Sequence, residues 1–415
     1  MRHKRGNIPE RKHNSLPTHT IQMTEKNRIQ ALDIMRGITI AGMIMVNNPG
    51  SWSTIYAPLR HASWCGLTPT DLVFPFFMFI MGITTFLSLQ RYDFKPTATV
   101  LKKIITRTLG IILVGIFISW FAHFCYYWND ADDSLGFGRQ LLEAANVFPT
   151  LRYSGVLHRL AVCYGIVAIT ATLFNHKRFP WIILALFATY FVILEAGNGY
   201  AYDETNILSI VDRAILTPAH MYNDNSIDPE GILSTIPSIG HVMTGFCVGR
   251  MMFRKDCANE PRSNTQILYS KITRLLLFGA CILMIGFLFS YACPINKKIW
   301  SPSFAMVTCG FGSLLLAVLI WLIDIKGKKS WGRFFEVFGV NPLFMYVMSD
   351  IVAILFGSVL FYSNGNDINI IRYTYINLIP LFGENGASCI YALLFVCLNW
   401  CIGYPLYKRK IYIKL

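Results

Sequence analysis

Residues 70–90, TDLVFPFFMFIMGITTFLSLQ, decide the fold class. This stretch contains a single charged side chain, Asp71, and its length matches the roughly 20 residues that a transmembrane helix needs. The whole chain shares this character, because 54% of its 415 residues are hydrophobic, 14% are charged and the mean hydropathy is +0.44. Soluble domains carry about 25% charged residues. The sequence therefore predicts an integral membrane protein.

Similar apolar runs recur along the chain. They lie at residues 30–47, 70–90, 104–124, 155–174, 180–197, 233–250, 273–291, 303–323, 334–357 and 386–405. A further stretch, 370–382, is too short to span and is expected to be interfacial or re-entrant. We predict an all-α bundle of about ten (ten or eleven) transmembrane helices. It forms one domain, residues 30–407, between a disordered basic tail at 1–29 and a basic tail at 408–415.

Lys and Arg are unevenly distributed over the segments between these runs. Cytoplasmic loops of membrane proteins are enriched in both residues. If the N-terminus lies in the cytoplasm, the segments on the cytoplasmic side hold about three quarters of the 37 Lys and Arg residues. The pattern predicts that both termini face the cytoplasm. It also accounts for the net charge of +14 without a nucleic-acid partner.

The densest polar cluster is the predicted outer loop between the first two runs, which contains Arg60, His61 and Trp64. Histidine exchanges a proton near neutral pH, so His61 suits a general base for an amine or hydroxyl nucleophile. Trp64 could stack on a sugar ring or anchor the loop at the membrane surface. Asp71 could cap its helix, face a polar partner, or do both. The histidines that compete for the catalytic role are His123, His158, His220 and His241.

Motifs of other chemistries are missing from the sequence. The eleven cysteines are scattered, and no two have C-x-x-C spacing. The sequence also lacks a G-x-S-x-G motif, an H-E-x-x-H motif and a Walker loop. We therefore expect no metal site and no phosphate-binding loop.

A long motif runs through the first two apolar segments. It comprises Asp33-x-x-Arg36-Gly37, Val46-Asn47 and His61-Ala62-Ser63-Trp64-x-Gly66-Leu67-Thr68-x-x-Asp71-Leu72-Val73-Phe74-Pro75, and it ends in Phe79-Ile80-Met81-Gly82. Later matches are Gly155-Val156-Leu157-x-Arg159-Leu160, Asp228-Pro229-Glu230-Gly231-Ile232-Leu233, Asn296-Lys297-x-x-Trp300-Ser301 and Gly339-x-Asn341. Over about residues 30–405 these motifs resemble the heparan-α-glucosaminide N-acetyltransferase family of transmembrane acyltransferases.

The resemblance implies an enzyme that moves an acetyl group from cytosolic acetyl-CoA to the amine of a glucosamine on the outer side of the membrane. Carried over by motif, His61 is the catalytic histidine and Asn47 is its polar companion. The stretch between these two residues is a few residues longer than in the animal enzyme, and the luminal domain of that enzyme has no counterpart in the printed sequence. We therefore expect a smaller or different amino sugar. The resemblance leaves open whether His61 carries the acetyl group or only removes a proton.

Basic residues near the predicted inner face are candidates for binding acetyl-CoA. Phosphate groups favour cationic partners. Arg36, Lys103 and Arg107 lie near the inner ends of the first and third predicted spans. They could bind the phosphates of CoA, or they could only orient the helices.

Further polar residues are candidates for binding the acceptor. Asp228 and Glu230 precede the sixth predicted span and could bind sugar hydroxyls or the ammonium group, or cap that helix. Arg159, at the outer start of the fourth span, and Asn341, within the ninth, could bind substrate or make structural contacts.

Two other functional classes stay open. One is an amino-sugar transporter or permease, in which polar residues would line a translocation path. The other is a membrane scaffold without catalysis. The expected partners are an amino sugar or oligosaccharide and membrane lipid, with a homodimer left open. The inside–inside topology suits a bacterial cytoplasmic (inner) membrane, with His61 on the outer side.

Overall fold

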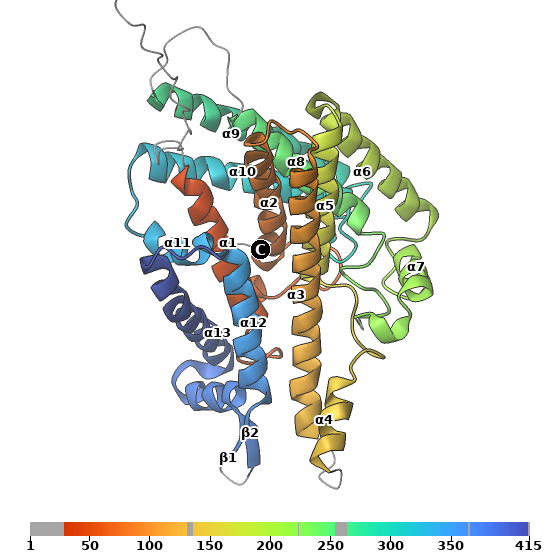
Figure 1. Cartoon of the computed structure of the whole chain (residues 1–415), viewed down its shortest axis with the longest axis vertical. Helices are drawn as coiled ribbons and strands as arrows, with labels where there is room; N and C mark the ends of the chain where they lie inside the picture. The colour runs from red at the N-terminus through yellow and green to blue at the C-terminus, as the bar shows by residue number, and fades with distance from the viewer. Residues whose placement is uncertain (1–28, 131–135, 223, 254–263, 364–365, 414–415) are drawn as a thin grey trace, which may run out of the picture.

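The computed structural model describes residues 29–130, 136–222, 224–253, 264–363 and 366–413, so nearly all of the predicted tail at 1–29 lies outside the described residues. The described part is mostly helical (Figure 1). Its helices are α1 (Gln30–Asn47), α2 (Val73–Gln90), α3 (Ala98–Asp130), α4 (Phe137–Ala145), α5 (Val156–Leu173), α6 (Phe179–Ala196), α7 (Ile207–Ile215), α8 (Thr235–Phe253), α9 (Asn264–Phe289), α10 (Pro302–Leu319), α11 (Gly332–Val340), α12 (Pro342–Ser358) and α13 (Ile370–Lys408).

Shorter elements connect these helices. They are the 3₁₀ helices η2 (Ala57–Leu59), η3 (Pro69–Leu72), η4 (His176–Arg178) and η5 (Pro218–His220), the π-helix η6 (Ile320–Ile325), and the strands β1 (Leu360–Ser363) and β2 (Asn366–Asn369). The two strands form an antiparallel hairpin in which Leu360 is paired with Asn369.

Within the described residues, seven helices are long and apolar enough to cross a membrane, and the number is eight if the bent pair α11 and α12 forms one span. Each of the ten predicted runs is helical. The two runs outside this count are α1, which contains Asp33 and Arg36, and α8. The membrane character of the chain is therefore confirmed, while ten spans and an inside–inside topology stay predictions.

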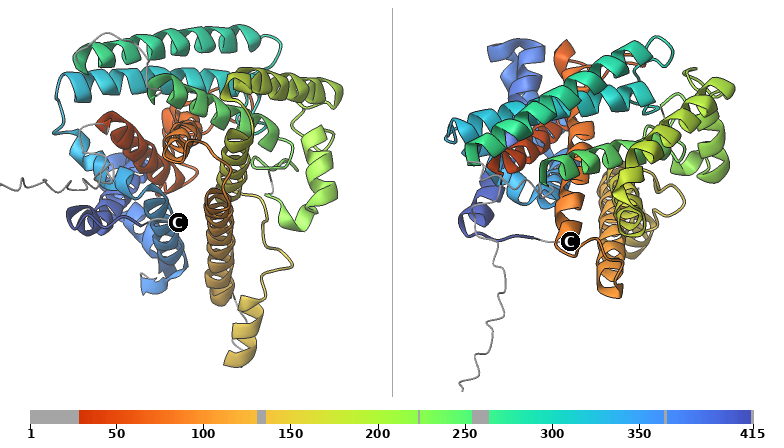
Figure 2. Two further views of the ribbon diagram at one scale, coloured as in Figure 1. Left: turned by 45° about the horizontal axis from the view of Figure 1, so that its top comes forward. Right: turned by 90° about the horizontal axis from the view of Figure 1, so that it is seen from above.

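The apolar helices form an inner and an outer set. α2, α5 and α10 are mostly buried, whereas α3, α6 and α9 expose most of their apolar side chains. Examples are Leu113, Trp181 and Leu277, which are 64%, 72% and 63% exposed. Figure 2 shows α9 and α10, which pack along each other, at the edge of the bundle. Large apolar surfaces are unfavourable in water, so the outer set suits a lipid environment.

Two apolar helical segments are interrupted, one within α13 and one between α11 and α12. Gly383 has a φ of +67°, a conformation that glycine adopts without a steric penalty, and it divides α13 into two halves. The first half contains the stretch 370–382, and the second contains the predicted run 386–405. α11 and α12 meet at 87° around Asn341, whose side chain donates to the Ile411 carbonyl and accepts from the Ile413 N–H. The described end of the chain is therefore attached to this bend.

Two glycines bring α1 and α11 into direct contact. A Cβ atom on Gly37 would lie 1.8 Å from the Phe335 carbonyl oxygen, and one on Gly339 would lie 2.1 Å from the Asp33 carbonyl oxygen. Arg36 joins the same helices by donating to the Asp33 side chain at 3.0 Å and to the Gly339 carbonyl at 3.2 Å. Motif residues about 300 positions apart in sequence are thus neighbours in the fold.

Gly37→Ala is expected to destabilise the protein, because the added methyl group would overlap the Phe335 carbonyl. Overpacking of this kind costs about 1–3 kcal/mol, so the midpoint of thermal unfolding in detergent should fall by several degrees. Gly42→Ala, on the same helix, is the matched control, because its Cβ would meet Val73 at 3.4 Å. Equal midpoints for the two variants would contradict the close approach of α1 and α11.

Candidate active site

Three ionisable side chains meet beside the loop that joins α1 to α2. His61 Nδ1 lies 2.6 Å from Asp71 Oδ1. Lys297 Nζ lies 3.0 Å from the same ring nitrogen and 3.4 Å from the same carboxylate oxygen. The Asp71 side chain is fully buried, whereas that of His61 is 41% exposed. The cluster therefore has a buried carboxylate at its base and an accessible imidazole at its surface.

The short helix η3 positions Asp71. Pro69 occupies its first turn, where the missing N–H costs nothing, and Thr68 forms a capping box with Asp71. Asp71 Oδ2 accepts from Thr68 N at 3.1 Å, from Thr68 Oγ1 at 3.0 Å and from Ala62 N at 3.1 Å. The two predicted roles of Asp71, helix cap and partner of a polar group, are thus combined in one side chain.

The contact with Asp71 decides where neutral His61 carries its proton. An ionised carboxylate can only accept a hydrogen bond, so Nδ1–H donates to Asp71 and Nε2 keeps its lone pair. That lone pair can accept a proton from a substrate. Among the described histidines, His61 alone has a carboxylate within 4 Å. In the described part of the chain, no carboxylate lies within 4 Å of the ring of any predicted competitor. These competitors are His123, His158, His220 and His241.

Lys297 belongs to the Asn296-Lys297-x-x-Trp300-Ser301 motif, for which the sequence predicts no role at the site. It lies in the loop between α9 and α10, which is held by hydrogen bonds from Asn296 N to Ser301 Oγ and from Gly66 N to the Ile295 carbonyl. Burial lowers the pKa of Lys297, and the nearby carboxylate of Asp71 opposes this effect. The motif could have indicated Lys297 as a site residue, but sequence spacing alone could not place it beside His61.

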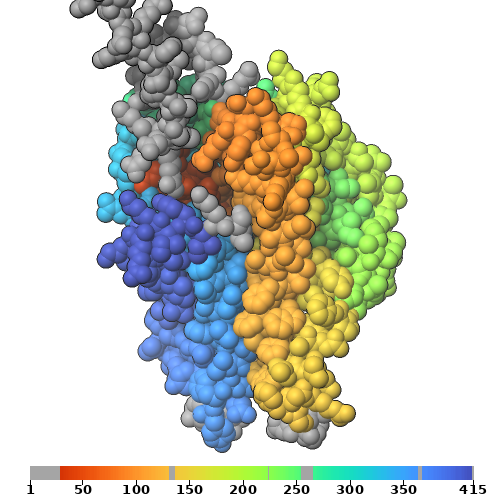
Figure 3. Space-filling view, viewed as in Figure 1, coloured from red at the N-terminus to blue at the C-terminus, as the bar shows by residue number. Residues whose placement is uncertain are grey.

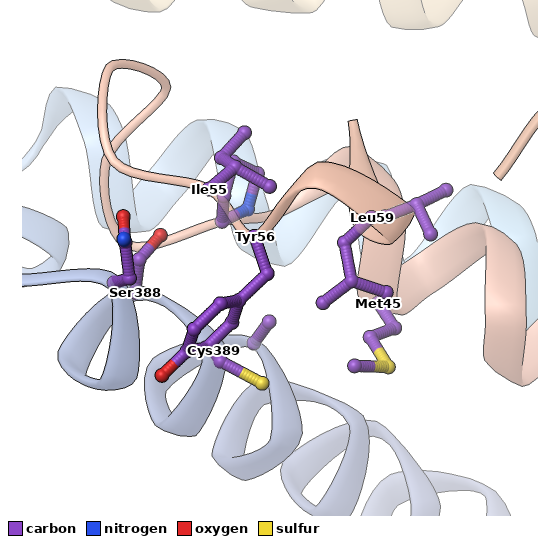
Figure 4. Close-up of a pocket in the computed structure, with 10 residues that line it drawn as sticks. Met45, Ile55, Tyr56, Leu59, Ser388 and Cys389 are labelled. Carbon is purple, nitrogen blue, oxygen red and sulfur yellow. The ribbon is translucent and has the colours of Figure 1, made fainter. Parts of the chain in front are cut away.

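The loop between α1 and η2 is attached to α13. Gly50 N donates to the Ser388 carbonyl, Ser51 N donates to Ser388 Oγ, and Ser388 Oγ donates to the Ser51 carbonyl. Figure 4 shows Tyr56 directed toward α13 beside Cys389, in a pocket between the loop and this helix. The pocket has a volume of about 10 Å³, which is about the space of one water molecule. The hydrogen bonds to Ser388 fix the loop, and the pocket is too small for a sugar.

A larger cavity lies away from the predicted site residues. Its volume is about 450 Å³, and it lies between α3, α4 and α12. Figure 3 shows α3 and α12 side by side on this face of the molecule. The lining is mainly apolar and contains no predicted site residue. Its residues are Phe124, Cys125, Trp128, Asn129, Phe137, Leu141, Leu355, Ser358, Val359 and Leu360.

Arg152 organises a second cluster of charges. Its Nη2 atom donates to Asp228 Oδ1 at 2.6 Å and to Glu230 Oε2 at 2.7 Å. Asp228 is fully buried and also accepts from Ser154 and from the backbone N–H groups of Tyr222 and Glu230. Burial raises the pKa of the Asp228 carboxyl, but these donors outweigh burial and hold the pKa below its usual value. These contacts of Asp228 therefore hold its own turn and attach that turn to the segment before α5.

Glu230 is placed differently from Asp228. Its side chain is 14% exposed, and its Oε1 atom accepts no hydrogen bond from the described residues. The Glu230 carboxylate also raises the pKa of Lys297, against the stronger effect of burial. The two clusters thus lie within electrostatic reach of each other, and Glu230 retains an oxygen that can accept a ligand's hydrogen bond.

Arg159 connects the loops that carry Glu230 and Lys297. It is 2% exposed, donates to the Gly231 carbonyl and to Ser234, and places its guanidinium 5.4 Å from the centre of the Trp300 ring. Trp300 is itself buried three residues after Lys297. The position of Arg159 is therefore between two site loops rather than at an open surface.

Trp64 has one ring face covered by protein. Its ring stacks on Tyr202 with centroids 4.4 Å apart, and its Nε1 donates to the Tyr200 carbonyl at 2.8 Å. Tyr202 also accepts from Lys298, which pairs with Asp224 at 2.8 Å. Trp64 therefore joins the His61 loop to the segment after α6, which leaves less of the ring for stacking on a sugar.

Three other predicted site residues form no side-chain hydrogen bond with His61 in the described structure. Arg60 is exposed and donates to the Ile55 carbonyl of its own loop. Asn47 is exposed at the last position of α1. Asn341 is at the bend between α11 and α12. Their predicted roles stay predictions.

The three basic residues predicted near the inner face have separate partners. Arg36 contacts α11, Lys103 Nζ donates to Tyr92 Oη at 3.1 Å, and the Arg107 guanidinium lies 4.7 Å from the centre of the Tyr164 ring. Each of these three contacts involves a different part of the fold. Three or more His, Cys, Asp or Glu side chains do not gather there, or elsewhere in the described part, to hold a metal ion.

Comparison with known proteins links this geometry to a family. Residues 28–291 match the family described as Heparan-alpha-glucosaminide N-acetyltransferase, catalytic. The Heparan-alpha-glucosaminide N-acetyltransferase of Mus musculus is 27% identical over 396 residues, which are 79% of this chain and 54% of that protein. The Homo sapiens protein of the same name is 28% identical over 386 residues, 77% of this chain and 52% of that protein. The chain spans about half the length of these relatives. It belongs to the family of the heparan-α-glucosaminide N-acetyltransferase catalytic region.

Proposed function

We propose that the chain is a transmembrane N-acetyltransferase that moves an acetyl group from acetyl-CoA to the amine of a glucosamine-type sugar. The observation that carries this proposal is the contact between His61 and the buried Asp71. It leaves His61 Nε2 as an accessible base. Acetylation of an amine needs such a base, because the nitrogen loses a proton when it forms the amide.

The bond changes are those of acyl transfer. The amine nitrogen attacks the thioester carbonyl carbon, the N–C bond forms and the C–S bond breaks. His61 Nε2 accepts the proton that the nitrogen loses, and the CoA thiolate takes up this proton to leave as the free thiol. In the covalent alternative, Nε2 attacks the thioester carbonyl, the C–S bond breaks and CoA leaves as the thiolate. The amine then attacks the acetyl group on Nε2, the bond to Nε2 breaks, and Nε2 accepts the proton that the amine loses. Only that route leaves radiolabelled acetyl on the protein when acceptor is absent.

The proposed sidedness rests on the distribution of charge. About three quarters of the 37 Lys and Arg residues fall in the segments predicted to be cytoplasmic, and the loop that carries His61 falls outside. Acetyl-CoA would enter from the inner side, and Arg36, Lys103 and Arg107 are the proposed partners of its phosphates. We place the protein in a cytoplasmic (inner) membrane.

His61→Ala is expected to lower the rate of CoA release from acetyl-CoA and glucosamine by about 10²–10⁴-fold, because the base for the amine proton is lost. The measurement uses purified protein in detergent and a thiol reagent. His123→Ala, which removes a ring whose Nε2 lies 3.1 Å from Thr150 Oγ1, is the matched control. A wild-type rate for His61→Ala would overturn the assignment. If the wild type releases no CoA and sealed vesicles that contain it take up the sugar, the result would favour a transporter.

Glu230→Gln is expected to raise the KM for the acceptor amine about tenfold and to leave the KM for acetyl-CoA unchanged. The reason is that the free Oε1 atom is proposed to accept from the ammonium or a hydroxyl of the sugar, and charge-assisted hydrogen bonds are roughly twice as strong as neutral ones. Glu204→Gln, which alters an exposed ion pair with Arg213, is the control. A change confined to the KM for acetyl-CoA would contradict this role.

A further inference from the structure

Lys297 occupies a position that the reaction chemistry above does not explain. Its ammonium lies 3.0 Å from His61 Nδ1, although that nitrogen already directs its proton to Asp71. Two donors cannot share one hydrogen bond, so Lys297 has no acceptor in the ring when Nδ1 is protonated. Its partner is instead Asp71 Oδ1, at 3.4 Å. The ammonium is thus held beside the imidazole by a carboxylate oxygen that both groups contact.

The charges of the cluster balance only with Lys297 present. Asp71 carries one negative charge, Lys297 carries one positive charge, and neutral His61 carries none. A carboxylate favours protonation of a neighbouring imidazole, and a cation disfavours it. The charged groups that act on Lys297 itself are Asp71, Glu230 and Lys298. Burial lowers the pKa of Lys297, and the two carboxylates oppose this effect by favouring its ammonium form.

The loop of Lys297 is shaped independently of the Lys297 side chain. Asn296 and Ser301 hold its two ends through hydrogen bonds of their own. Trp300 has a φ of +51°, which is rare for a bulky residue, and its ring packs edge-on against Phe74 at 5.4 Å. Strained backbone persists only where its surroundings hold it in place. The loop is therefore fixed to α2, and this attachment sets where Lys297 lies.

We propose that Lys297 is a positioning residue that offsets the charge of Asp71, so that His61 remains an unprotonated base with its free lone pair on Nε2. This inference rests on the proposed function only for its catalytic consequence. The effect on His61 protonation is a property of the cluster alone, and it can be measured without any turnover.

The test measures the pH dependence of His61 modification by diethyl pyrocarbonate, which reacts with neutral imidazole. Mass spectrometry of the His61 peptide gives the rate at each pH, and other histidines in the same sample are internal references. In Lys297→Met the midpoint is expected to rise by about one pH unit, because the imidazolium no longer faces a cation. In Asp71→Asn it should move the opposite way. Lys297→Arg keeps the charge and should keep the wild-type midpoint.

Lys298→Met is the matched control. It removes the same charge from the next position, where the ammonium pairs with Asp224 and contacts Tyr202 instead of Asp71. The midpoint of His61 should stay at its wild-type value. If Lys297→Met does not give a monodisperse protein, Lys297→Gln serves for the same measurement. An unchanged midpoint in a folded Lys297→Met or Lys297→Gln protein would overturn the proposal.

Activity measurements separate this proposal from the proposed function. At a pH below the wild-type midpoint, CoA release by Lys297→Met should fall about tenfold, since a rise of one unit leaves about one tenth as much neutral imidazole. Lys297→Arg should restore it. If the wild type shows no CoA release while the modification midpoints shift as expected, the proposed reaction fails and the role of Lys297 stands. If the wild type releases CoA but the modification midpoint of His61 does not shift in Lys297→Met, the role of Lys297 fails and the proposed reaction stands.

Discussion

The site depends on the burial of one carboxylate. Asp71 has no exposed surface, and a buried charge is strongly unfavourable unless hydrogen bonds and an opposite charge satisfy it. Donors from two segments meet this requirement: Ala62 and Thr68 in the loop before η3, and Lys297 in the loop before α10. The need to satisfy Asp71 thus brings these segments together. His61 takes its orientation from the same requirement.

Asp228 applies the same principle on the neighbouring loop. It is buried and receives hydrogen bonds from Arg152, Ser154 and the backbone of its own turn. Helix packing sets the frame of the bundle, and the connecting segments bury apolar residues such as Ile227 and Trp300. Buried carboxylates with several donors add hydrogen-bond networks to this packing. The functional side chains are therefore on loops that apolar burial and charge hold together.

Much of the fold followed from local pattern, whereas the site followed only in part. Each predicted apolar run is helical, because hydropathy and length are local properties, although the run 334–357 is divided between α11 and α12. Contacts between distant segments leave no local signal in the sequence. Lys297 is 236 residues from His61. Tyr202 covers a ring face of Trp64 that the sequence alone predicted could stack on a sugar. The His61–Asp71 contact lies within a single motif. The motif made both residues candidates, but only the fold showed that they form a pair.

Rigidity is the remaining property that such a cluster needs. Coulomb interactions in a partly buried site change steeply with distance, so the effect of Lys297 on His61 would vary if α2 and α10 moved independently. Trp300 prevents this, because it contacts Phe74 of α2, His241 of α8 and Phe304 of α10 within 6 Å between ring centres. One buried ring thus holds three helices and the Lys297 loop as a unit. A conformational change that admitted substrates would therefore have to occur elsewhere in the bundle, or disturb this packing and the protonation of His61 together.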